Sequence, residues 1–145
     1  MTSVTLASTL SGDQELTPTV TGGVGTGTLT LSSPSNAVTG SIGINGLTAT
    51  AAHIHQGATG ANGGVIVELV KSPTDSGSWS VPAGTILTQA QADAFALGGL
   101  YFNAHTPENA GGEIRGQIGR DVSTAQLTSA QEVPSNSSTA TGNGF

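Results

Sequence analysis

All three histidines of the chain lie in two short motifs, and together they could hold a transition-metal ion. His53 and His55 belong to AAHIHQ, and His105 ends LYFNAH. If both motifs are strands, residues i and i+2 share a face, so His53 and His55 project together, about 7 Å apart at Cα. Tyr101 and Asn103 share the face of His105. Where the strands are neighbours, three imidazoles converge, and a three-nitrogen site with an open position suits Cu(II) or Zn(II).

The same histidines have a purely structural interpretation. In a β protein, a His-x-His pair can equally donate hydrogen bonds to loop carbonyls and hold a nearby turn in place. The Gly-rich segment QGATGANGG, which follows His55 directly, is such a turn. The residues alone therefore leave two alternatives open, a metal site or a set of structural histidines.

A second group of interest consists of Glu15, Glu113 and Arg115. The chain has only three cationic side chains, so an Arg inside a strand is expected to have an assigned carboxylate partner. Glu15 is the candidate, and a bidentate pair would lock the first strand onto the last. The alternative is that these are solvated charges that never meet. We expect no catalytic acid or base among them.

Short strands must position these residues. Thr, Val, Ile and Leu recur in short runs separated by turn residues, which is typical of strands joined by tight turns. Seven or more such runs indicate an all-β Greek-key sandwich or barrel, similar to superoxide dismutase or to immunoglobulin domains. The expected strands are 4–10, 25–31, 38–47, 50–55, 65–70, 100–105 and 113–118.

One segment, residues 88–97, has a different pattern and predicts a short helix. Thr88 is a plausible N-cap, and Gly98 a plausible residue in the left-handed conformation after the helix end. We expect Ala92, Phe95 and Ala96 to face the core.

The end of the chain repeats its beginning. A shift of about 117 positions superimposes the two segments without a gap. We therefore predict one domain over residues 1–121 and a C-terminal extension over 122–145 that restarts it, as a partial second repeat or a donated strand. The repeated residues are Leu127, Gln131, Glu132, Val133, Gly142 and Gly144, which fall on Leu10, Gln14, Glu15, Leu16, Gly25 and Gly27.

Three segments of the chain resemble the chordin-type CHRD domain. They are LSGDQELTP with the following GTGTLTL, AAHIHQGATGANGGVIVEL, and GGLYFNAHTPENAGGEIRGQI, and together they span most of residues 8–119. The resemblance implies an extracellular β-sandwich module that is often present in tandem and has no assigned catalytic activity.

A weaker resemblance is to copper/zinc superoxide dismutase. Gly46-Leu47 before His53-Ile54-His55, and NAHTPENAGGEIRGQIG after it, are similar to copper-site segments of that enzyme. By position, His53, His55 and His105 would match three copper ligands. The chain has no fourth histidine to bridge to zinc and no cysteine, so the resemblance implies the fold rather than dismutase activity.

Composition excludes several partners. Net charge is −6 and only 8% of residues are charged, so no basic patch is available to bind a phosphate backbone or an anionic membrane. No apolar run approaches the roughly 18 residues of a membrane helix.

We expect a non-enzymatic module, extracellular or at the cell surface. We expect it to associate head-to-tail with copies of itself through its C-terminal segment and to form filaments. The alternative is a copper or zinc module based on the three histidines.

Overall fold

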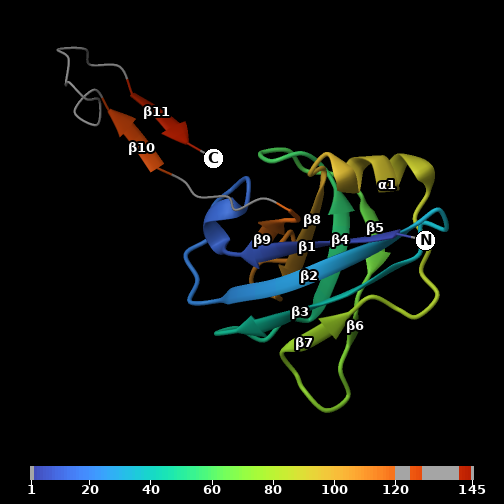
Figure 1. Ribbon diagram of the computed structural model, residues 1–145. Coiled ribbons are helices and arrows are strands. Elements are labelled where there is room, and N and C mark those ends of the chain that lie inside the picture. Colours follow the sequence, from blue (N-terminus) through green and yellow to red (C-terminus); the bar gives the residue numbers. More distant parts are fainter. Residues whose placement is uncertain (1, 120–124, 129–140, 145) are drawn as a thin grey trace.

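The computed structural model describes residues 2–119, 125–128 and 141–144. Two antiparallel sheets pack face to face, with one helix across an end of the strands (Figure 1). The predicted all-β sandwich with one short helix is confirmed. The elements are β1 (Thr2–Leu10), a 3-10 turn (Gly12–Gln14), β2 (Val24–Ser33), β3 (Val38–Asn45), β4 (Ala51–Gln56), β5 (Val65–Glu68), β6 (Val70–Lys71), β7 (Ser78–Ser80), α1 (Gln89–Ala96), β8 (Leu100–His105), β9 (Ile114–Gln117), β10 (Ala125–Thr128) and β11 (Thr141–Gly144).

The first sheet has the strand order β1-β2-β3-β7-β6, and the second β5-β4-β8-β9. The core between the two sheets follows from the period-2 alternation of the sequence, because every second side chain of a strand points inward. Leu29 of β2, Ile42 of β3, Ile54 of β4 and Phe102 of β8 are each 1% exposed or less. β7 was not among the predicted strands and extends the first sheet beyond β3.

The two sheets are joined along the edges of β1 and β9. Ser11 and Arg115 exchange two backbone hydrogen bonds of 3.0 Å, and Gly119 N–H donates to the Ala7 carbonyl at 2.8 Å. Gly116 lies on β9 between these contacts. A Cβ at this position would overlap the Thr9 carbonyl oxygen. Glycine therefore allows the close approach of β9 to β1, which we call the β1–β9 seam.

The helix agrees with its sequence signals except on one flank. Thr88 caps it, and the side chain of Gln91 completes a capping box. Gly98 follows with φ 75°. Ala92 and Phe95 are buried, as expected. Ala96, however, is exposed, and the prediction for it was wrong, because it lies on the side of Ala92 opposite to Phe95.

β10 and β11 pair with each other and form a separate two-stranded sheet. Leu127 is opposite Gly142 in this pair, and Leu10 is opposite Gly25 in the pairing of β1 with β2. Leu127 and Gly142 thus lie about 117 positions after Leu10 and Gly25, respectively. The pairs Ala125–Gly144 and Gln126–Asn143 keep this offset, because they correspond to Ser8–Gly27 and Thr9–Thr26. Gln131, Glu132 and Val133 lie outside the described residues.

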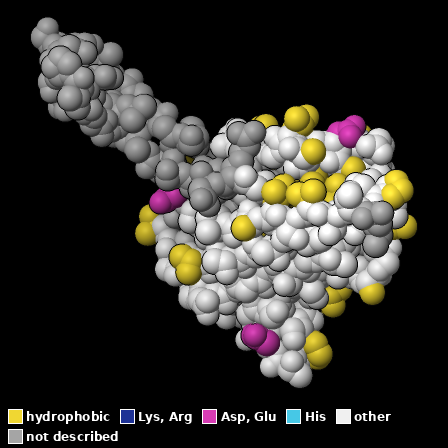
Figure 2. Space-filling model, viewed as in Figure 1, with side chains coloured by type: hydrophobic (Ala, Val, Ile, Leu, Met, Phe, Trp, Pro, Cys, Tyr) yellow, Lys and Arg dark blue, Asp and Glu magenta, His cyan; other side chains and the backbone are white. Residues whose placement is uncertain are grey.

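The described surface is mostly polar and neutral. Figure 2 shows one face with scattered apolar side chains, few acidic ones and no Lys or Arg in its described part. No helix in the described ranges is long and apolar enough to cross a membrane.

Candidate metal centre

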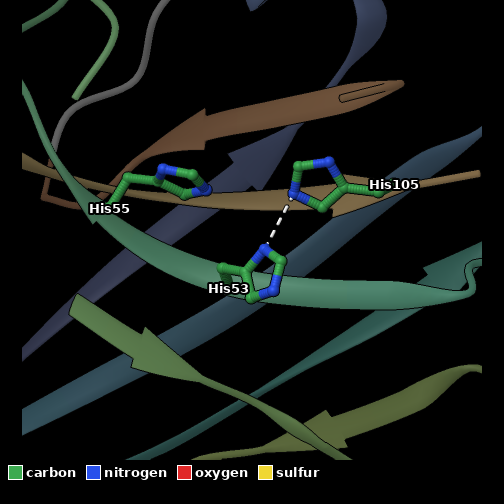
Figure 3. Close-up of side chains that lie close together, drawn as sticks. All are labelled: His53, His55 and His105. Atoms are coloured by element: carbon green, nitrogen blue, oxygen red, sulfur yellow. Dashed lines mark hydrogen bonds between the residues drawn. The ribbon is translucent and has the colours of Figure 1, made fainter. Parts of the chain in front are cut away.

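The three histidines lie on the outer face of the second sheet, opposite the core. β4 and β8 are neighbours, and their register places His53 beside Asn103, His55 beside Tyr101, and His105 beside Ala51. One ring nitrogen from each histidine lies within 4.8 Å of the others. Figure 3 shows the rings gathered on this face, His53 and His55 from β4 and His105 from β8. The alternation of β4 and the pairing of β4 with β8 together produce this convergence.

Backbone carbonyls fix two of the three rings. His55 Nδ1–H donates to the Gly63 carbonyl at 2.9 Å, and His105 Nδ1–H donates to the Ala110 carbonyl at 3.0 Å. Because a carbonyl only accepts, Nδ1 must carry the proton in each neutral ring, and Nε2 keeps its lone pair. His55 Nε2 is buried and has no hydrogen-bond partner within the described part of the chain. In both rings Nε2 is therefore the nitrogen that could bind a metal, and the hydrogen bond from Nδ1–H to the carbonyl orients the ring.

His53 is held by another histidine rather than by a carbonyl. Its Nδ1 lies 2.9 Å from His105 Nε2, the contact drawn as a dashed line in Figure 3. Since His105 Nε2 has the lone pair, His53 Nδ1–H is the donor. The other nitrogen of His53 lies 4.0 Å from the carboxylate of Glu68, whose side chain is 85% exposed. Transfer of this proton from Nδ1 to Nε2, which gives the other neutral tautomer, would free the Nδ1 lone pair as the third ligand and leave Nε2–H facing that carboxylate.

Burial keeps the three rings neutral. It is the largest cause that lowers the pKa of His53, His55 and His105 below the ordinary value of 6.5. His105 lowers the pKa of both other rings further, because like charges on neighbouring imidazoles repel. Neutral imidazole is the form that binds a metal. Three neutral nitrogens that approach each other from two strands fit Zn(II) or Cu(II), both of which imidazole binds.

A comparison with protein families identifies the fold unit that carries this cluster. Residues 6–118 match the CHRD domain. The chain belongs to the CHRD domain family. Searches among curated proteins and solved structures gave no match. The matched residues contain all three histidines and the Ser11–Arg115 contact of the β1–β9 seam, whereas β10 and β11 lie beyond them.

In this CHRD domain Arg115 makes no direct ion pair with either predicted carboxylate. It is 1% exposed, and its guanidinium donates to the Ala58 carbonyl at 3.0 Å, to Gln117 Oε1 at 3.2 Å and to Asn62 Oδ1 at 3.4 Å. It also lies over the Tyr101 ring, 3.6 Å from the centroid. The expected bidentate pair with Glu15 is absent from the described residues, because loop 57–63 occupies the guanidinium instead.

The two carboxylates make other contacts. Glu15 Oε1 accepts a 2.5 Å hydrogen bond from Asn103 Nδ2. Burial raises the pKa of Glu15, while the bond from Asn103 and the charge of Arg115 act against this. Glu113 accepts hydrogen bonds from Thr21 at 2.6 Å and Thr106 at 2.7 Å, which lower the pKa of its carboxyl. Glu15 thus joins the segment after β1 to β8, but through an amide rather than through Arg115.

Two further residues belong to the site and were not predicted as part of it. Tyr101 stacks on His55 with 4.9 Å between ring centroids and 7° between ring planes. Tyr101 and His105 are four residues apart on one strand and so share a face, which means that the sequence could have predicted Tyr101 as part of the site. Glu68 lies opposite His53 in the pairing of β4 with β5. Only that register, which the sequence does not give, brings it there.

Proposed function

We propose that this CHRD domain is an extracellular β-sandwich module that binds a copper or zinc ion through His53, His55 and His105 and catalyses no reaction. CHRD domains are typically extracellular, which supports the location. The observation that carries the metal proposal is the buried Nε2 of His55, which has no hydrogen-bond partner among the described residues, in a ring that shares a cluster of ligand nitrogens within 4.8 Å with both other histidines.

The purely structural interpretation explains only part of this arrangement. It accounts for the bonds of His55 and His105 to loop carbonyls. It gives no partner to His55 Nε2, and a buried acceptor without a hydrogen bond costs about 1–3 kcal/mol. A metal ion would use this lone pair, and the carbonyl bonds would then orient the ligands. The two roles of the histidines are therefore compatible.

Titration of metal-free protein with Cu(II), followed by electron paramagnetic resonance, tests the proposal. We expect nitrogen hyperfine structure from several imidazoles, and competition by Zn(II). His55→Ala should weaken binding at least tenfold, since it removes one of three ligands. Asp13→Asn, which removes an exposed carboxylate outside the cluster, is the matched control and should bind as the wild type does. A spectrum without nitrogen coupling, or equal affinity in both variants, would exclude the site.

We propose self-association of the CHRD domain as a second function, and the register of β10 with β11 favours it. In β1 and β2 the equivalent residues are packed into the sandwich. Leu10 is 2% exposed, and a Cβ at Gly25 would lie 3.2–3.5 Å from Gly43, Leu10 and Ile114. The C-terminal segment repeats this Leu–Gly pair, so it carries residues suited to the same place in a second copy. Such contacts are head-to-tail, and head-to-tail contacts that do not close into a ring produce filaments, which is the assembly we propose.

Size-exclusion chromatography with light scattering tests self-association. The full chain should form oligomers whose mass rises with concentration, and a chain without residues 124–145 should be monomeric. Electron microscopy of the full chain should show fibres. Monomeric full-length protein at high concentration would rule out this second function.

A further inference from the structure

Arg115 on β9 is buried next to the histidine cluster, separated from His55 by the Tyr101 ring, and the metal proposal gives it no role. Arg115 has one of the largest fully buried side chains of the domain. A buried cation is costly unless its donors are satisfied. Two of its partners, the Ala58 carbonyl and Asn62 Oδ1, belong to loop 57–63. The guanidinium therefore ties this loop to β9.

The same loop holds His55. The Gly63 carbonyl accepts the Nδ1–H of His55 at 2.9 Å. At the other end of the loop, Gly57 N–H donates to the Gly99 carbonyl at 2.8 Å, and its own carbonyl accepts from Gln117 Nε2 at 2.8 Å. The position of Gly63, and with it the tautomer and direction of His55, thus depends on a loop that is held from the β9 side.

Tyr101 makes a second connection from Arg115 to His55. β8 runs between β4 and β9, so Tyr101 stands between the two side chains. The guanidinium lies 3.6 Å from its ring centroid, and the His55 ring stacks on it at 4.9 Å. The Tyr101 hydroxyl accepts from Gly63 N–H at 3.0 Å. The Tyr101 side chain and loop 57–63 are therefore connected at Gly63, the residue whose carbonyl accepts the hydrogen bond from His55.

We infer that Arg115 is a positioning residue of the metal site, which sets the orientation of His55 through loop 57–63 and the Tyr101 ring. This inference rests on the proposed metal function. Arginine suits the role because its planar guanidinium stacks on an aromatic ring and donates several hydrogen bonds in its plane. Lysine has the same charge but neither property, so Arg115→Lys separates geometry from charge.

The experiment compares the wild type with Arg115→Lys, Tyr101→Phe and Asn62→Ala, each checked for folding by circular dichroism. In Arg115→Lys, Cu(II) affinity should fall at least tenfold, as for other residues that orient metal ligands, with altered nitrogen hyperfine couplings. The other two variants each remove contacts of a single side chain, so we expect losses of about two- to fivefold. Lys71→Ala removes an exposed cation and should change nothing.

A second measurement needs no metal. In the metal-free wild type, the Nδ1–H of His55 should give a protected proton resonance, and Arg115→Lys should lose or broaden it. Should Arg115→Lys fail to fold, Tyr101→Phe and Asn62→Ala decide the question by the same two readouts. Unchanged affinity, couplings and ring resonance in the folded variants would overturn the inference. If the wild type binds no metal, the metal function fails, and the ring resonance alone shows whether Arg115 positions His55.

Discussion

Replacement of Gly116 by alanine should destabilise the domain through the β1–β9 seam. A Cβ there would overlap the Thr9 carbonyl oxygen and lie 2.5 Å from Ser8 Oγ. The nearest obstacle is backbone, which cannot rotate away as a long side chain can. β9 must therefore move away from β1, or the strands must remain strained.

Both responses have similar free-energy costs. If β9 moves, the domain loses the two bonds between Ser11 and Arg115 and the bond from Gly119 to Ala7. At about 1 kcal/mol net for each hydrogen bond, the loss is about 2–3 kcal/mol. If the strands stay in place, overpacking costs about 1–3 kcal/mol. We expect the free energy of unfolding to fall by about 2–3 kcal/mol, a large part of the 5–15 kcal/mol typical of a domain.

Urea unfolding gives this number directly. The chain contains one tryptophan, and Trp79 is only 6% exposed, so its fluorescence reports loss of the core. Gly43→Ala is the control, because a Cβ on this β3 residue meets nothing within 4 Å. It should change stability by no more than about 0.5 kcal/mol. If Gly116→Ala unfolded at the same urea concentration as Gly43→Ala and the wild type, the argument for the seam would be wrong.

Three further predictions follow from the helix and the histidines. Thr88→Ala removes the N-cap of α1 and should cost about 1 kcal/mol in the same urea assay; an unchanged midpoint would contradict the capping role. Acidification should destabilise the metal-free domain as the pH falls below 6.5. There the unfolded chain binds protons that His53, His55 and His105 resist, because their pKa values are lowered, and a variant with all three replaced by Gln should lose much of this dependence. Zn(II) at 100 times its dissociation constant should stabilise the wild type by about 2.7 kcal/mol, and His55→Ala should abolish this effect in a thermal melt.

Local sequence signals predicted most elements of the fold. Alternating residues in β2, β3 and β4 and the capping residues of α1 depend on neighbours in the chain, which the sequence displays. β7 was not predicted because Ser78–Ser80 is only three residues long, too short for its alternation to be told from a loop. It is a strand because β3 is beside it.

The candidate site was predictable up to the convergence of its histidines. His53 and His55 share a face by period alone, and the resemblance to a known family pointed to His105. The partners of Arg115 could not be foreseen, since loop 57–63 folds over β9 only in the assembled domain. Charge balance suggested Glu15, but hydrogen bonds to backbone and amide oxygens satisfy the guanidinium without a carboxylate.

The β1–β9 seam also determines how a further strand could reach the sandwich. It covers the edge of β1 from Ala7 onward, and β5 and β6 are the edge strands at the opposite sides of the two sheets. These have four and two residues, and Glu68 and Lys71 at their ends put a charge on each, a feature that discourages strand addition. A β1-like strand from a second molecule would therefore have to displace the domain's own β1 rather than extend a sheet. Because displacement requires partial unfolding, assembly by this route would be slow and would accelerate steeply with temperature.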